Sequence, residues 1–213
     1  MLNNMENEEI QLSGQESLSI IQQMIATAKQ EQKDDGKGWI VWGWAIFAAS
    51  LLTIVNQRMD WFSTFFFWNI FGLLTLVLMT YEIIRDFFLK KKERVKTYTQ
   101  VIYQKLNIGF FVCLMFIIVS MNVGVGPMKG FSLLLALYGF WILIYAALLD
   151  FRPSLIGAFI TWACGIASLF ATTFEWVMIL HAIAVLCGYI IPGHIANREF
   201  NKLHSRSIKA DSV

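Results

Sequence analysis

The stretch LNIGFFVCLMFIIVSMNVGVGPM, Leu106–Met128, contains no Asp, Glu, Lys or Arg. Five further stretches share this property, and each is at least 20 residues long: 38–57, 61–81, 130–149, 153–174 and 176–197. An apolar α-helix needs about 20 residues to cross about 30 Å of hydrocarbon. Because the stretches lack the in-out alternation of barrel strands, they predict six transmembrane helices.

The composition of the chain points to the same class of protein. Of its 213 residues, 57% are hydrophobic and only 15% are charged, and the mean hydropathy is +0.57. A soluble helical bundle is the alternative, but the core helices of such a bundle usually carry a polar face. Runs such as Leu73–Met79 and Phe110–Val119 are apolar all round. We therefore expect an all-α, polytopic membrane protein.

The charge-free stretches also predict how the chain is divided. A membrane domain is expected over residues 38–197, between a cytoplasmic segment at 1–37 and a cytoplasmic tail at 198–213. The expected spans are about 39–56, 61–81, 106–123, 130–149, 154–172 and 176–193, with a cytoplasmic helical extension at 82–105.

The N-terminal segment contains the pattern of an amphipathic helix. Ser13 and Glu16 have the spacing of a capping box, and apolar residues then recur at i, i+3 and i+4. This helix either lies on the lipid or across the bundle, or presents its apolar stripe to a protein partner. The 82–105 segment is a second candidate surface for such a partner.

The positive charges predict the orientation of the chain. Of the 17 Lys and Arg residues, all but Arg58 and Lys129 fall on one side of the six spans. The positive-inside rule then places both termini in the cytoplasm, and we expect a multi-pass protein of the bacterial inner membrane. No signal peptide precedes residue 38, so the first span is expected to act as an uncleaved anchor. The net charge of +2 reflects this orientation and does not indicate nucleic acid as a partner.

Few residues within the spans are suited to catalysis. The sequence contains no H-E-x-x-H, no G-x-S-x-G and no paired Asp within a span. Cys113, Cys164 and Cys187 each lie alone, without the C-x-x-C spacing of a metal or redox site. We expect no catalytic residue, no metal and no cofactor, and therefore a protein that is not an enzyme.

Two polar residues within the predicted spans remain candidates for function. Asn69 lies in the second span and His181 in the sixth, and both can hydrogen-bond a neighbouring helix as structural contacts. The alternative is that both line a polar pathway, because an ionisable residue within a membrane is a functional candidate by default.

Charged residues at the cytoplasmic edge form a second candidate group, which consists of Glu82, Arg85, Asp86, Asp150, Arg152 and His194. The first three share one side of a helix by their i, i+3, i+4 spacing. Such a cluster either locks the helix ends through ion pairs or forms a gate or a docking surface for a partner.

Small residues recur every four positions along the last two spans. Gly157, Thr161 and Gly165 lie on the fifth span, and Ala184 and Gly188 lie on the sixth. Small residues allow two helix backbones to approach closely in lipid, so these two spans are expected to pack against each other, or the fifth to form a dimer. Beyond them, "CGYIIPGHIANREF" (Cys187–Phe200) predicts a helix end at Pro192 and Gly193, with His194 in the wet interface.

Two short motifs suggest relatives. The chain begins its first span with "WGWAI" (Trp42–Ile46) and leaves its last span with "GYIIPGH" (Gly188–His194). With the amphipathic helix that ends in Gly, these motifs resemble a set of uncharacterised six-span bacterial inner-membrane proteins. That resemblance implies no assigned activity, ligand or catalytic residue. We expect a non-enzymatic interaction, sensor or accessory subunit, whose partner is another protein or a second copy of this chain. The alternative is a small-solute or ion transporter or channel with a path near Asn69 and His181.

Overall fold

The computed structural model describes residues 35–88 and 98–210. Every regular element in this part of the chain is helical, as predicted. These elements are α2 (Lys37–Met59), α3 (Phe66–Phe88), α4 (Tyr98–Ser120), α5 (Pro127–Leu149), α6 (Arg152–Leu169), α7 (Phe174–Val185) and α8 (Ile191–Ala210), with π-helical turns η1 (Met121–Val125) and η2 (Leu186–Ile190). The predicted N-terminal amphipathic helix lies outside the described residues, and so does 89–97 of the predicted extension.

The described helices have the length and composition of membrane spans. Five segments are long and apolar enough to cross a membrane: Lys37–Met59, Lys105–Val125, Pro127–Leu149, Arg152–Leu169 and Phe174–Lys202. The apolar part of α3, Phe66–Leu78, is shorter. The prediction of an all-α polytopic membrane protein is confirmed.

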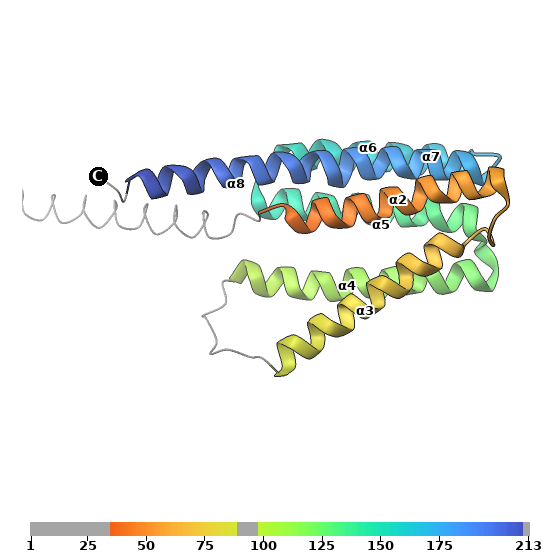
Figure 1. Ribbon diagram of the computed structural model, residues 1–213, viewed down its shortest axis with the longest axis horizontal. Helices are drawn as coiled ribbons and strands as arrows, with labels where there is room; N and C mark the ends of the chain where they lie inside the picture. Colours follow the sequence, from red (N-terminus) through yellow and green to blue (C-terminus); the bar gives the residue numbers. More distant parts are fainter. Residues whose placement is uncertain (1–34, 89–97, 211–213) are drawn as a thin grey trace, which may run out of the picture.

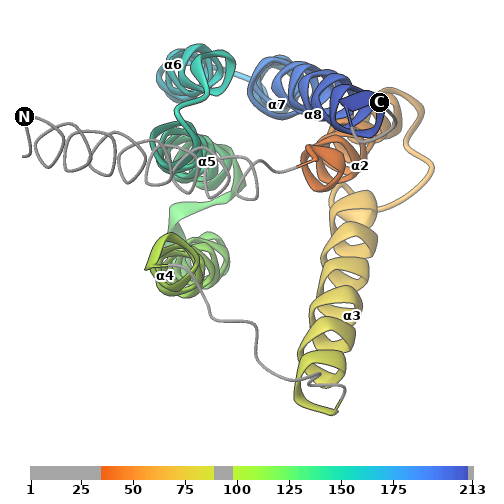
Figure 2. The same cartoon turned by 90° about the vertical axis from the view of Figure 1, so that its left-hand side faces the viewer.

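The helices divide into a packed group and two outlying members. Helices α2, α5 and α6 and the continuous rod α7–η2–α8 lie together, and α4 lies beside α5 (Figures 1 and 2). Helix α3 starts next to α2 and then leans away from the other helices. We call the end with the α2–α3, α4–α5 and α6–α7 connections the far end, and the opposite end, where α2 begins, the terminal end.

The small residues of α6 serve two different neighbours. A Cβ atom on Gly157 would lie 2.7 Å from the carbonyl oxygen of Cys187 in η2, so the two backbones are in contact there. The Thr161 hydroxyl lies 2.8 Å from the Gly157 carbonyl and 3.4 Å from the Ala184 carbonyl of α7. A Cβ atom on Gly165 would instead meet Leu135 of α5 at 3.2 Å. Helix α6 therefore packs closely on both sides.

The predicted helix end at Pro192 and Gly193 is wrong. The chain continues as α8 to Ala210. A proline lacks an N–H group and its ring collides with the carbonyl four residues earlier, but the π-helical turn Leu186–Ile190 precedes it directly. In that turn the Ile191 N–H donates to the Leu186 carbonyl, five residues back, and this wider turn accommodates the proline. Gly193 instead permits close packing, since its Cβ atom would lie 3.2 Å from the backbone nitrogen of Ile40.

The second span also begins later than predicted, at Phe66 and not at residue 61. Asp60 ends α2 in a left-handed conformation, with φ 52°. The Asn56 side chain then organises the connection: its Nδ2 donates to the carbonyls of Phe62 (3.0 Å) and Ser63 (3.2 Å), and its Oδ1 accepts from the Phe62 N–H (2.9 Å). These contacts hold the charge-free residues after Asp60 in a loop.

Replacing Asn56 by Ala should lower the free energy of unfolding by about 1–2 kcal/mol. The Asn56 side chain is buried, and its removal leaves the carbonyls of Phe62 and Ser63 and the N–H of Phe62 without this partner. Unfolding in detergent with increasing dodecyl sulfate, followed by circular dichroism, measures this change. Gln57→Ala, at the exposed neighbouring position, is the control and should have no measurable effect. Equal stability of N56A and the parent protein would contradict this role of Asn56.

Candidate functional site

His181 lies on α7 in the centre of the packed helices. Its side chain is wholly buried, at 0% exposure. The ring Nδ1 atom lies 3.0 Å from the hydroxyl oxygen of Ser50 on α2. That hydroxyl is also 2.9 Å from the carbonyl of Ile46, one turn earlier on the same helix. One nitrogen of the histidine is therefore tied to α2.

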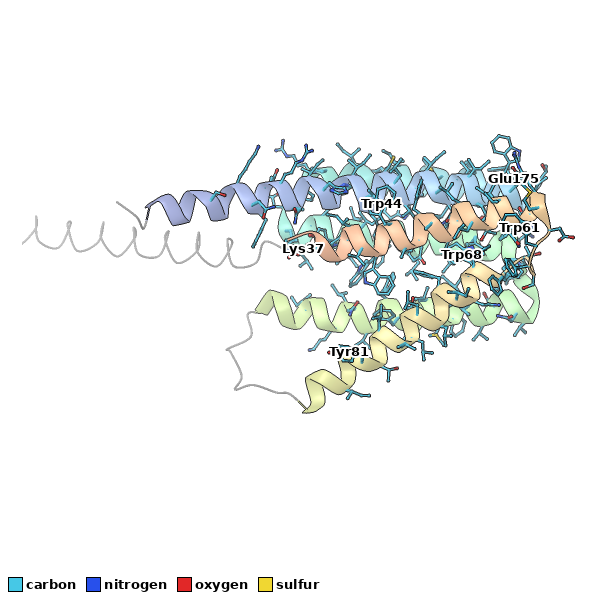
Figure 3. All side chains as sticks on the ribbon, in the orientation of Figure 1. Lys37, Trp44, Trp61, Trp68, Tyr81 and Glu175 are labelled. Atoms are coloured by element: carbon cyan, nitrogen blue, oxygen red, sulfur yellow. The ribbon has the colours of Figure 1, made fainter. Side chains whose placement is uncertain are left out.

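Three aromatic side chains surround the histidine ring. The ring centroids of Trp68, Phe131 and Tyr138 lie 5.3, 5.6 and 5.9 Å from that of His181, and all three contacts are edge-on. Phe131 and Tyr138 come from α5, whereas Trp68 comes from the start of α3, where Figure 3 labels it. We call His181, Ser50 and these three rings the histidine box.

Two buried polar atoms of the histidine box have no protein partner among the described residues. One is Nε2 of His181, and the other is the indole Nε1 of Trp68. Buried polar atoms in proteins are usually hydrogen-bonded, so two such atoms on rings in mutual contact distinguish this place from ordinary helix packing.

The structure does not bring Asn69 and His181 together. Asn69 is exposed on α3, and no hydrogen bond of its side chain occurs within the described residues. Its neighbour Trp68 is the residue that faces the bundle. Sequence reasoning missed this because α3 is apolar on all sides, so hydropathy alone does not indicate which side is packed.

The cytoplasmic-edge cluster is only partly described. The side chains of Glu82, Arg85 and Asp86, near the end of α3, lie outside the described part of the chain. Asp150 ends α5, Arg152 begins α6 and His194 lies on α8; all three are exposed, and none forms an ion pair with another described residue.

A polar cavity of about 370 Å³ opens at the far end. It is lined by Asn56, Gln57, Asp60, Phe62, Thr64, Thr173, Phe174 and Glu175. The Arg58 side chain forms an ion pair with Glu175 beside it, and so links α2 to α7. Phe174 stacks edge-on against Phe131 at 5.5 Å, and Phe131 in turn contacts His181. Aromatic rings therefore separate this cavity from the histidine box.

No group of three or more His, Cys, Asp or Glu side chains with the arrangement of a metal site occurs within residues 35–88 and 98–210. The cysteines Cys113, Cys164 and Cys187 are free thiols. The histidine box contains a single possible metal ligand.

Replacing Ser50 by Ala should lower the free energy of unfolding by about 1 kcal/mol, the usual size of a hydrogen bond between helices in a membrane protein. Dodecyl sulfate unfolding measures it. The matched control is Thr53→Val on the same buried face, because the Thr53 hydroxyl bonds only to Ala49 of its own helix. If S50A is no less stable than T53V, the contact with His181 contributes nothing to stability.

Comparison of the chain with protein-family models, curated proteins and solved structures finds no match.

Proposed function

We propose that the protein is a non-enzymatic interaction or accessory subunit of the bacterial inner membrane, which binds a transmembrane helix of another membrane protein against α3 and α4. The proposal depends on the exposed apolar surface of these two helices. The other helices form a packed group that serves as the scaffold for them.

Among the side chains that the structure describes, those at the start of α3 are the ones that attach it to the packed helices. Phe65, Trp68 and Phe71, at spacings of three, pack against the core. From Leu76 to Ile84, every side chain that the structure describes is exposed. Leu76, Val77 and Leu78 are consecutive, so they cover about 200° of the helix circumference. This part of α3 therefore presents apolar side chains on more than one face.

Helix α4 shows a similar excess of exposed surface. In its apolar segment Lys105–Val125 no residue is fully buried, whereas 33% to 50% of the corresponding windows in the other four candidate spans are buried. Phe110 packs against Trp141 of α5, with ring centroids 4.9 Å apart, but Phe116 is 78% exposed. One face of α4 therefore packs against α5, and the opposite face is exposed to lipid or to another helix.

The exposed amide of Asn69 favours a protein partner over lipid alone. An amide in an apolar helix is stabilised when another helix supplies a hydrogen-bonding group. The distribution of Lys and Arg supports cytoplasmic termini, so the terminal end would face the cytoplasm. Asn69 lies near the far end and would therefore meet its partner close to the opposite side of the membrane.

Photo-crosslinking in native membranes tests the proposal. A photoreactive amino acid at Leu76 of α3 or Phe116 of α4 should give one discrete crosslinked protein of constant size. The controls are Phe159 and Ile166 of α6, which are also apolar and exposed, at 58% and 61%; they should label lipid only. A crosslink that joins two differently tagged copies would identify a homo-oligomer. Equal crosslinking at α6, or none at α3 and α4, would contradict a specific docking surface.

A transporter is the second candidate, favoured by the polar cavity at the far end. From that cavity the buried polar side chains Asn56, Thr53 and Ser50 follow α2 toward His181. Solvent access separates the two functions. A cysteine at Thr53, in a chain whose three native cysteines are replaced by Ser, should react with a water-soluble maleimide if the path conducts solutes. Protection of this cysteine would exclude transport along α2.

A further inference from the structure

The two unpartnered nitrogen atoms of the histidine box have complementary hydrogen-bonding roles. The Ser50 hydroxyl has one hydrogen atom, and the Ile46 carbonyl at 2.9 Å is an acceptor only. When that hydrogen is donated to Ile46, the Ser50 oxygen accepts from His181, so Nδ1 carries the ring proton. Nε2 then has a free lone pair and is an acceptor. The indole Nε1–H of Trp68 is a donor only.

These roles define the chemistry of a ligand. A group between the two rings must accept a hydrogen bond from Trp68 and donate one to His181. A carbonyl oxygen only accepts, and an ammonium group or a metal ion cannot accept from the indole. A hydroxyl group does both. We infer that His181 Nε2 and Trp68 Nε1 bind one hydroxyl group between them, that of a water molecule or of a small alcohol.

The surroundings of the two atoms support a bound hydroxyl. His181 is 0% exposed, so the site lies in a closed interior, and the edge-on rings of His181 and Trp68, whose centroids are 5.3 Å apart, would have to separate slightly to admit the hydroxyl oxygen. Leaving both nitrogen atoms without a partner in an apolar interior is unfavourable, and a buried water molecule is the usual solution. The polar cavity at the far end is separated from the box by the rings of Phe174 and Phe131, so a small molecule would enter from that side only when these rings move.

The bound hydroxyl would complete a chain of hydrogen bonds through three helices. The chain runs from Trp68 on α3 through the hydroxyl to His181 on α7, and then to Ser50 and Ile46 on α2. It would hold the first turns of α3 to the packed helices and fix where α3 leaves them. This inference is independent of the proposed partner, since it concerns only the inner side of α3.

Nuclear magnetic resonance of the full chain in lipid nanodiscs tests the inference. His194→Gln and His204→Gln leave His181 as the only histidine, which is then labelled with ¹⁵N together with the tryptophans. In a sample free of alcohols, we expect a protonated Nδ1, an unprotonated Nε2 and transfer of magnetisation from water to the Trp68 indole proton. If the transfer is absent but both signals shift saturably when ethanol is added, the hydroxyl is that of a solute. A protonated Nε2, or neither response, overturns the inference.

Two substitutions provide a matched comparison. Trp68→Phe keeps an aromatic ring and removes the donor, so the ¹⁵N shift of His181 Nε2 should change and its contact with water should be lost. Trp176→Phe removes an indole that is 57% exposed on α7 and should leave the His181 signals unchanged. An unchanged Nε2 signal in W68F also overturns the inference. The Trp68 signal of the parent protein decides the question even if W68F does not fold.

Discussion

Replacing Gly157 by Ala should lower the free energy of unfolding by about 3 kcal/mol, at the upper end of the range for overpacking a tight contact. The new methyl group would lie 2.7 Å from the carbonyl oxygen of Cys187 and 3.0 Å from the Cα atom of Gly188. Both are backbone atoms of η2, so no side chain can rotate to make room. Helices α6 and α7 would have to separate, and the 3.4 Å contact of Thr161 with Ala184 would lengthen further.

Unfolding with dodecyl sulfate, followed by circular dichroism, measures the effect of this substitution. Gly109→Ala on α4 is the control, because no atom lies within 4 Å of the added methyl group. Alanine is the better helix former, so G109A should be neutral or stabilising by about 0.5–1 kcal/mol. A G157A protein as stable as G109A would show that α6 and η2 are not in backbone contact.

The sequence was sufficient to predict the fold class and the faces of close packing, but not which neighbour each part of α6 contacts. The thickness of a bilayer fixes the length of a spanning helix, so the charge-free stretches were sufficient to predict the fold class. The small residues indicated which faces approach closely. They could not indicate that Gly157 meets η2 while Gly165 meets α5, because that depends on how α6 is rotated between its two neighbours.

The continuation of the last helix through Pro192 could not be predicted either, because it too depends on local backbone geometry. A proline and a glycine in succession usually end a helix, and the polar residues that follow fit a tail. The π-helical turn Leu186–Ile190 reverses this outcome, and its wider hydrogen-bonding pattern has no simple signature in the sequence. The continuous rod then carries α8 past the start of α2.

The histidine box was predicted only in part. His181 could be identified because an ionisable residue is rare within a span. Its partners could not, since Ser50 is 131 positions away in the chain and Trp68 resembles the other aromatic residues of α3. The sequence indicated Asn69 as the candidate on the second span because it is polar, yet its side chain is exposed and does not face the packed helices. The orientation of α3 depends on Phe65, Trp68 and Phe71 packing together, which is a property of the folded bundle.

Replacing Gly36 by Ala should also cost about 3 kcal/mol, from two separate causes at the terminal end. Gly36 has a φ of 69°, a left-handed conformation that costs an alanine about 1–2 kcal/mol. Its added methyl group would also lie 2.5 Å from the Gly193 carbonyl oxygen and 3.1 Å from the backbone nitrogen of Asn197. Overpacking of this kind contributes a further 1–3 kcal/mol or so. The start of α2 should therefore detach from α8, with loss of the 2.7 Å hydrogen bond from Asn197 Nδ2 to the Asp35 carbonyl.

Gly38→Ala separates this local effect from a general effect of substitution. Gly38 lies only two residues further on, within α2, and has nothing within 4 Å of an added methyl group. G38A should leave the dodecyl sulfate midpoint unchanged or raise it slightly, whereas G36A should lower it. Asn197→Ala removes the hydrogen bond alone, so its smaller loss, about 1 kcal/mol, measures the share that the bond contributes. Equal midpoints for G36A and G38A would mean that α2 does not begin against α8. The predicted order, with G36A least stable, then N197A and then G38A, follows only if Gly193 brings the two helices into backbone contact.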